Sequence, residues 1–154
     1  MLKAGLIGAA VGLVLAIIAA VITPFCNPCA ALVLGLGVGV LAGVFAKPVT
    51  GGGSAGEGAK AGAIAGAGGL LGQMIGAVIN GFVVGPEGVA RLYRQLNLPL
   101  DINAQSYWLF NIGGNCLCAL VNVGLAAGLG ALGGLLWYQI AGKKQSPPPA
   151  PSTF

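Results

Sequence analysis

Four stretches of the chain are long, apolar and free of charged residues, and they limit its possible folds more than any other feature. They cover residues 4–22, 30–46, 61–84 and about 117–141, and none contains Asp, Glu, Lys, Arg or His. A helix needs about 20 apolar residues to cross the hydrocarbon core of a bilayer, with a range of roughly 17 to 25. The stretches therefore predict four transmembrane helices. The alternation of apolar and polar residues that is typical of β-barrel strands does not occur.

The composition agrees with a membrane environment. Of the 154 residues, 56% are hydrophobic and 6% are charged, whereas a soluble domain carries roughly 25% charged residues. The glycines lie inside apolar runs, which argues against a disordered linker. We expect an all-α membrane protein, in which residues 4–22 form a retained helix because this apolar run is too long for a typical signal sequence.

The basic residues predict an orientation, because lysine and arginine in short loops favour the cytoplasmic side. With the N-terminus inside, five lysines lie inside and two arginines outside, which gives an integral protein of a bacterial-type inner membrane with both termini cytoplasmic. The polar connection 47–60 is expected to be a mobile loop, and the Pro-rich tail 143–154 is expected to be disordered. The basic residues are Lys3, Lys47, Lys60, Lys143 and Lys144 inside, and Arg91 and Arg94 outside.

Residues 86–114 are predicted to lie at the outer membrane surface, completing a transmembrane domain over residues 1–142. Their first part has apolar residues at helical spacing beside polar ones, which predicts a short amphipathic helix. A single helix over residues 106–140 would be roughly 50 Å long, so we expect the chain to turn at Gly113–Gly114. The helical spacing is carried by Val89, Leu92, Tyr93 and Leu96.

Small residues recur at every fourth position in all four apolar stretches. Within lipid there is little hydrophobic drive between helices, and small residues allow the close backbone approach that holds them together. Gly39→Leu is therefore expected to disrupt packing much more than Val38→Leu. The pattern resembles that of the glycine-zipper membrane proteins, and the resemblance implies close helix packing and often oligomers. The glycines expected at helix contacts are Gly8, Gly12, Gly35, Gly39, Gly43, Gly62, Gly66, Gly68, Gly72, Gly76, Gly124, Gly128, Gly130 and Gly134.

Four cysteines, Cys26, Cys29, Cys116 and Cys118, fall on the outer side in this topology. Disulfides are favoured outside the reducing cytoplasm, and the pairing stays open because four cysteines allow three connectivities. The alternatives are free packing cysteines, a redox role and a zinc site of four thiolates.

The order of these pairs also resembles the quinone-coupled membrane disulfide oxidases of bacteria. The resemblance would make Cys26 and Cys29 the quinone-proximal pair and Cys116 and Cys118 the partner-facing pair. The chain lacks the basic residue that this family carries shortly after its Cys-x-x-Cys, and its second pair is more closely spaced.

Groups for acid-base chemistry are scarce, since the chain has no histidine and only three acidic residues, all in loops or near the interface. Catalysis by proton transfer needs positioned titratable groups. The deepest polar side chains are neutral, and we expect them to form hydrogen bonds between helices. They are Gln73, Asn80 and Asn122.

These features favour a non-enzymatic integral membrane protein that acts as a structural or accessory subunit of a membrane assembly or homo-oligomer. We expect no catalytic, cofactor-binding or metal-binding residues and no cofactor. The expected partners are the lipid bilayer and copies of the chain or other membrane subunits. Nucleic acid is not expected because the basic residues form no patch, and no small-molecule substrate is evident. The alternatives are a small pore or holin-like channel, and a quinone-coupled membrane thiol oxidase that uses the outer cysteine pairs.

Overall fold

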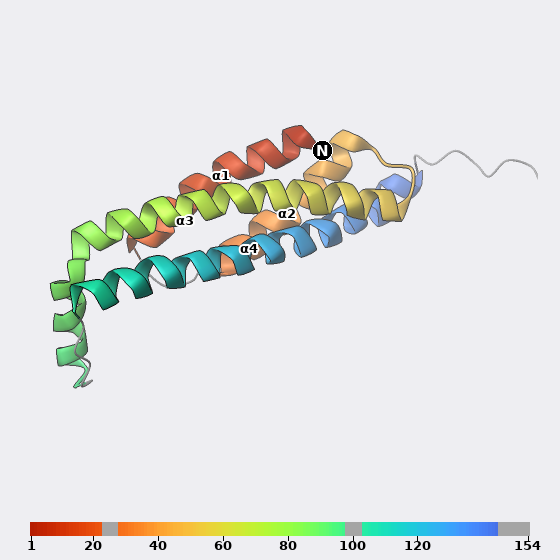
Figure 1. Cartoon of the computed structure of the whole chain (residues 1–154). Helices are drawn as coiled ribbons and strands as arrows, with labels where there is room; N and C mark the ends of the chain where they lie inside the picture. The colour runs from red at the N-terminus through yellow and green to blue at the C-terminus, as the bar shows by residue number, and fades with distance from the viewer. Residues whose placement is uncertain (23–27, 98–102, 145–154) are drawn as a thin grey trace, which may run out of the picture.

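A computed structural model of the chain, which describes residues 1–22, 28–97 and 103–144, contains four long helices (Figure 1). They are α1 (Leu2–Ile22), α2 (Pro28–Ala46), α3 (Gly51–Gln95) and α4 (Ala104–Ile140), and α4 is followed by the short 3₁₀ helix η1 (Gly142–Lys144). The described residues contain no strand, and each long helix has the length and apolar composition to cross a membrane. The expected all-α membrane fold is confirmed.

The helices form a bundle in which chain neighbours run in opposite directions. Backbone contacts place Gly68 against Ala9 and Gly72 against Leu13, so α3 runs parallel to α1. The same reasoning makes α2 parallel to α4, and the most extensive interface joins antiparallel α3 and α4. One end of the bundle therefore holds Lys47, Lys143 and Lys144, and we call it the lysine end. The opposite end leads to Arg91 and Arg94 and is the arginine end.

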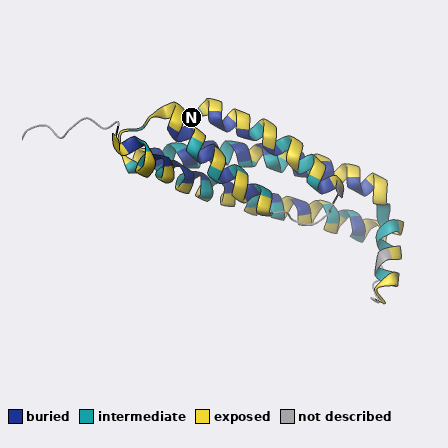
Figure 2. Ribbon diagram, turned by 180° about the vertical axis from the view of Figure 1, so that it is seen from behind, coloured by how far each residue is buried: buried dark blue, intermediate teal, exposed yellow. Residues whose placement is uncertain are grey.

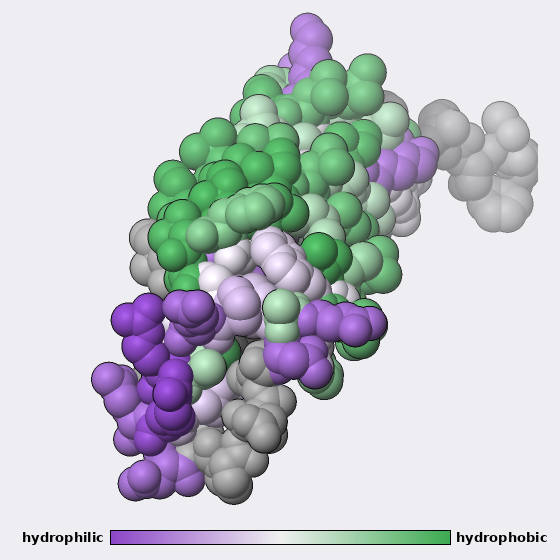
Figure 3. Space-filling view, turned by 60° about the vertical axis from the view of Figure 1, so that its left-hand side comes forward, coloured by the Kyte–Doolittle hydropathy of each residue, from purple (hydrophilic) through white to green (hydrophobic). Residues whose placement is uncertain are grey.

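Most of the buried hydrophobic residues are alanines, while many large hydrophobic side chains are exposed. Figure 2 shows the buried residues along the inside of the bundle and the exposed ones along its outside. One buried cluster contains Val38 and four alanines, whereas Val33 and Phe82 are 75% and 78% exposed. Figure 3 shows hydrophobic side chains covering the flank of the bundle and hydrophilic ones gathered at its end. This is the reverse of a soluble bundle, and it suits helices that pack by close approach in lipid.

The segment expected to be a mobile loop is mostly helical, because α3 begins at Gly51. Ser54 is fully buried, and its Oγ donates a 2.6 Å hydrogen bond to the carbonyl oxygen of Gly134. Lys60 and Glu57 form an ion pair at 3.4 Å on the outside of the same helix. The loop prediction was wrong because a face of small residues continues through this polar sequence and packs against α4.

A kink at Gly85 divides α3 into two parts. Gly85 has φ 64° and ψ 173°, a conformation that glycine adopts readily and other residues avoid. Pro86 follows at the first position of the second part, where its missing N–H costs no hydrogen bond. Figure 1 shows this second part leaving the bundle at a steep angle. The expected short helix carrying Arg91 and Arg94 is therefore present.

The single helix α4 replaces the expected turn at Gly113–Gly114. Asn103 caps its start, accepting a 2.8 Å hydrogen bond at Oδ1 from the backbone N–H of Ser106. Tyr107 and Asn115 are buried against α3, whereas the two glycines are exposed with open space around them. The turn prediction was wrong, and residues 104–114 continue the helix along α3, where Asn111 Nδ2 donates to the Ala77 carbonyl oxygen at 3.4 Å. Residues 145–154, most of the expected disordered tail, lie outside the described residues.

Candidate functional site

The lysine-end half of the α3–α4 interface is a contact between glycine backbones. A Cβ atom on Gly58 would overlap the carbonyl oxygen of Gly130, and one on Gly130 would overlap the carbonyl oxygen of Gly58. Gly62 faces the carbonyl of Ala126 in the same way, and Gly134 faces that of Ser54. Carbonyl oxygens this close to glycine Cα atoms are placed for weak Cα–H···O contacts. We call Gly58, Gly62, Gly130 and Gly134 the glycine contact face.

Most glycines expected at helix contacts are there, and two are not. Gly124 and Gly128 face open space, with no atom within 4 Å of an added Cβ. Gly58 also lies at a contact, as expected from the four-residue row that it forms with Gly62 and Gly66, whereas the contact of Gly133 was not assigned by the sequence analysis. The expected glycines at which an added Cβ would meet a neighbouring helix are Gly8, Gly12, Gly35, Gly39, Gly43, Gly62, Gly66, Gly68, Gly72, Gly76, Gly130 and Gly134.

The arginine-end half of the same interface is held by neutral polar side chains. Gln73 Nε2 donates to Asn115 Oδ1 at 3.3 Å, and Asn115 Nδ2 donates to the Asn111 carbonyl oxygen at 2.7 Å and to Asn111 Oδ1 at 3.0 Å. Asn122 Nδ2 donates to Gln73 Oε1 at 3.5 Å. We call Gln73, Tyr107, Asn111, Asn115 and Asn122 the amide network.

The expected interhelical hydrogen bonds of Gln73, Asn80 and Asn122 are confirmed. Asn80 bonds to α1, where its Nδ2 donates to the carbonyl oxygen of Val21 at 3.3 Å. Asn111 and Asn115 were missed because the sequence analysis placed Asn111 in the interfacial segment and Asn115 between that segment and the fourth span. Their spacing of four residues, starting at Tyr107, was the signal that they share one helix face.

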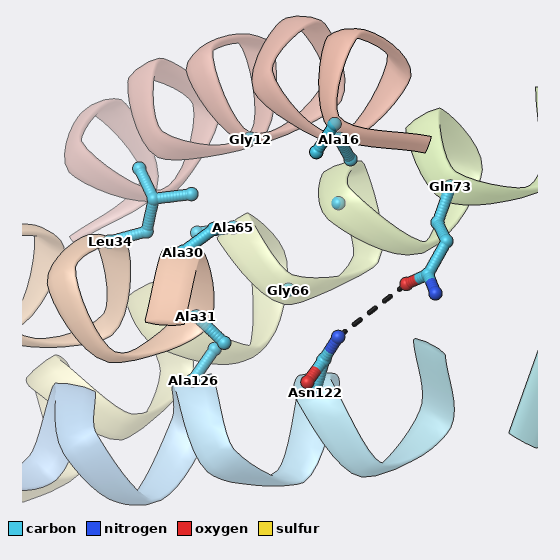
Figure 4. A pocket seen from close by; sticks show the side chains of 12 residues that line it. Gly12, Ala16, Ala30, Ala31, Leu34, Ala65, Gly66, Gln73, Asn122 and Ala126 are labelled. Carbon is cyan, nitrogen blue, oxygen red and sulfur yellow. Dashed lines mark hydrogen bonds between the residues drawn. The ribbon is translucent and has the colours of Figure 1, made fainter. Parts of the chain in front are cut away.

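A small cavity lies where the two halves of the interface meet (Figure 4). Its volume is about 60 Å³, and all four helices contribute to its wall. Glycine and alanine form most of the lining, including Gly12, Gly69 and Ala126. Gln73 and Asn122 supply the polar side chains of the wall.

Large aromatic side chains close both ends of the bundle. At the lysine end, Trp137 is buried and lies over Gly43, where an added Cβ would come within 2.7 Å of its ring. At the arginine end, Trp108 lies over Gly81 and makes an edge contact with Phe82, with ring centroids 5.4 Å apart. Each tryptophan therefore packs against a glycine of a neighbouring helix.

The described cysteines, Cys29, Cys116 and Cys118, are free thiols. Cys116 and Cys118 are two residues apart on one helix, so their side chains point to different sides. None of the expected disulfides among these three is formed, and Cys26 lies outside the described residues. Within the described ranges, no group of three or more His, Cys, Asp or Glu side chains is placed to hold a metal ion.

The glycine contact face and the amide network hold α3 and α4 together by close packing and by hydrogen bonds between uncharged groups. In the described part of the chain, the ion pair between Lys60 and Glu57 lies on the outside of α3, away from both the glycine contact face and the amide network. No protein-family model, no curated protein and no solved structure matches the chain.

Proposed function

We propose that the protein is a non-enzymatic integral membrane protein that associates laterally in the bilayer, as a homo-oligomer or as an accessory subunit of a membrane assembly. The supporting observation is the outward position of Gly124 and Gly128 on α4. They are spaced like the glycines that join helices inside the bundle, yet nothing in the described chain packs on them. In lipid, two small residues four apart allow another helix to approach closely.

The surroundings of these two glycines support the same proposal. Leu120, Val121 and Leu132 are 57%, 54% and 52% exposed on the same helix. Their positions along the helix put these side chains on the same side of α4 as the two glycines.

Native mass spectrometry of the full chain from mild detergent, with crosslinking in nanodiscs, tests this proposal. We expect a defined oligomer or a stoichiometric membrane subunit with the wild-type chain. Gly128→Leu should lower that association, while Gly37→Leu should not, because Gly37 is equally open but lies on α2. A chain that stays monomeric without a bound subunit in both media contradicts the proposal, and equal effects of the two variants show that α4 is not the contact.

The proposed orientation has both termini in the cytoplasm of a bacterial-type inner membrane, supported by the five lysines and two arginines described above. Gly52 is exposed near the start of α3 at the lysine end. A cysteine introduced there should react only with a membrane-permeant reagent in intact cells. Reaction with an impermeant reagent would show that the lysine end lies outside and that the opposite orientation holds.

A pore is the second candidate, and the amide network is the observation in its favour. Five polar side chains follow one another along the inside of the bundle and end at a cavity. Dye release from liposomes that contain the purified protein would support this candidate. Intact dye retention at high protein density would exclude it.

A further inference from the structure

An apolar groove runs between α1 and α2 on the outside of the bundle. Its volume is about 170 Å³, and no polar side chain lines it. Ile7, Val11 and Val33 are exposed at its edges, so the groove opens toward the surroundings of the bundle. The lining residues are Ile7, Gly8 and Val11 of α1 and Val33, Leu34, Gly37, Val38 and Leu41 of α2.

Two glycines explain why the groove exists. Gly8 lets α1 and α2 touch, because an added Cβ there would overlap the side chain of Val38. Gly37 lines the groove as well, but an added Cβ there would meet no atom within 4 Å. The two helices therefore pack at Gly8 and leave an open strip beside Gly37.

The dimensions of the groove suit a hydrocarbon chain. Its wall on α2 runs from Val33 to Leu41, a length of roughly 12 Å at 1.5 Å per residue. That length is close to the depth of one leaflet, which is half of a hydrocarbon core of about 30 Å. A volume of 170 Å³ over this length gives a cross-section of roughly 14 Å², whereas a helix is about 10 Å across. The groove can seat one extended chain, but it is too narrow to seat a helix.

Positive charge lies at one end of the groove. Lys3 stands four residues before Ile7 and so lies on the same face of α1, one turn closer to the lysine end. Lys47 directly follows the last residue of α2 at that end, and both lysines are exposed. Neither forms an ion pair with another residue in the described part of the chain, where Glu57 pairs with Lys60. The groove thus combines an apolar wall with unpaired cations at one end.

We propose that the groove binds one acyl chain of an anionic phospholipid, whose phosphate group lies at Lys3 and Lys47. The chain fills the strip beside Gly37, where it removes apolar surface from contact with other lipids and leaves no gap between the helices. Lysine near the membrane surface attracts anionic lipids. A zwitterionic lipid offers the same chain without net charge, so the site should select lipids by their headgroup. The site is separate from Gly124 and Gly128, and it does not depend on lateral association.

The test uses the full chain in phosphatidylcholine nanodiscs that contain a small amount of photoactivatable lipid. Two probes carry the same diazirine in the acyl chain, one with a phosphatidylglycerol and one with a phosphatidylcholine headgroup. After illumination, mass spectrometry of peptides locates the labelled residues. Labelling at Leu120, which is exposed on α4 outside the groove lining, gives the level for an ordinary lipid-facing residue.

We expect the phosphatidylglycerol probe to label residues 7–11 and 33–41 about fivefold more than the phosphatidylcholine probe does, relative to Leu120. Unlabelled phosphatidylglycerol should compete for these positions.

Two pairs of variants separate the acyl chain from the headgroup. Gly37→Leu places a side chain in the groove and should abolish the excess labelling, while Gly113→Leu should retain it, because Gly113 is equally open but lies on α4. Lys3→Gln should keep the labelling by the phosphatidylcholine probe and lower the preference for phosphatidylglycerol about fivefold. Arg91→Gln removes one positive charge at the opposite end and should leave the preference unchanged.

Three results would overturn the proposal. Equal labelling by the two probes in the groove and at Leu120 would make the groove an ordinary lipid-facing surface. Excess labelling that persists in a folded Gly37→Leu chain would place the lipid elsewhere. Disulfide crosslinks between two copies of a Val33→Cys chain, without excess lipid labelling, would assign the groove to a second copy. If Gly37→Leu does not fold, Lys3→Gln decides, because this exposed side chain can be changed without altering helix packing.

Discussion

The two halves of the α3–α4 interface join the same pair of helices by different chemistry. Near the lysine end, glycines stand on both helices, and the backbone of one occupies the space a side chain of the other would need. Near the arginine end, the facing residues are Gln73, Asn111 and Asn115, and hydrogen bonds between side chains span the gap. Close backbone packing holds the glycine half together, and hydrogen bonds between side chains hold the amide half together.

This difference shows how a chain without a hydrophobic drive between its helices can still fix their register. Glycine contacts tolerate no added atom, but they have little directional preference along the helix axis. Amide hydrogen bonds hold one register, yet each contributes only about 0.6 kcal/mol on average within a membrane. Together the two halves set both the distance and the register of α3 and α4.

The largest expected effect comes from adding bulk to the glycine half. A Cβ on Gly130 would lie 3.1 Å from the Gly62 Cα and overlap the Gly58 carbonyl. Because backbone cannot move aside like a side chain, Gly130→Leu should lower the free energy of unfolding by about 3 kcal/mol or more. Titration with SDS, following helix content and tryptophan fluorescence, measures this change.

Gly128→Leu is the matched control for this variant, since it lies two residues away and faces open space. Its unfolding free energy should stay within about 0.5 kcal/mol of the wild-type value when measured on the monomer. Equal losses in the two variants would mean that the glycine contact face is not where α3 and α4 meet.

The second prediction concerns the centre of the amide half. Gln73→Met keeps the side-chain length but leaves Asn115 Oδ1 and Asn122 Nδ2 without their partner. The free energy of unfolding should fall by about 1 to 2 kcal/mol, since buried polar groups lose their bonds. A double-mutant cycle with Asn115→Leu should show coupling between the two positions. Additive losses would indicate that the two amides act separately, and the network would then not be a unit.

The two halves also differ in how well they follow from the sequence. Four-residue glycine spacing predicted most contacts, because that spacing places residues on one helix face. It could not tell an inward face from an outward one, so Gly124 and Gly128 were assigned to contacts that the monomer lacks. Val38 shows the same limit, because the residue expected to tolerate leucine is buried in the core beside Gly8.

The amide half was harder to predict because a helix over residues 106–140 is longer than one span requires, so the chain was expected to turn at Gly113–Gly114. Asn111 and Asn115 were assigned outside the fourth span, although their partners Gln73 and Ala77 stand on a helix that was predicted correctly at that point. The pairing depends on the register of two helices, which a local pattern does not contain. The same reason explains Ser54, whose burial depends on the Gly134 carbonyl, 80 residues later.

A third, smaller effect tests whether the glycine half relies on the hydrogen bond of Ser54. Ser54→Ala removes the hydrogen bond to Gly134 and leaves the close backbone contact unchanged. The expected loss is about 0.5 to 1.5 kcal/mol, seen as faster amide hydrogen exchange confined to the first turns of α3. Thr50→Ala is the control, because its hydroxyl accepts only a local 3.1 Å bond from the Gly53 N–H. Faster exchange along the whole of α3 would mean that Ser54 holds more than the start of the helix.

The smallest effect is expected at the outer limit of the amide half, where Tyr107 joins the network. Its hydroxyl oxygen accepts from Asn111 Nδ2 at 3.2 Å, but the same nitrogen also donates to the Ala77 carbonyl oxygen. Tyr107→Phe therefore leaves Asn111 with a partner and should cost only about 0.5 kcal/mol, at the low end for one hydrogen bond. Tyr107→Leu should cost more, because it also loses the edge contact with Trp108, whose ring centroid is 5.6 Å away. Comparing the two variants by SDS titration separates the hydroxyl from the ring. If Tyr107→Phe costs as much as Gln73→Met, the hydroxyl of Tyr107 stabilises the network as much as its central amide does.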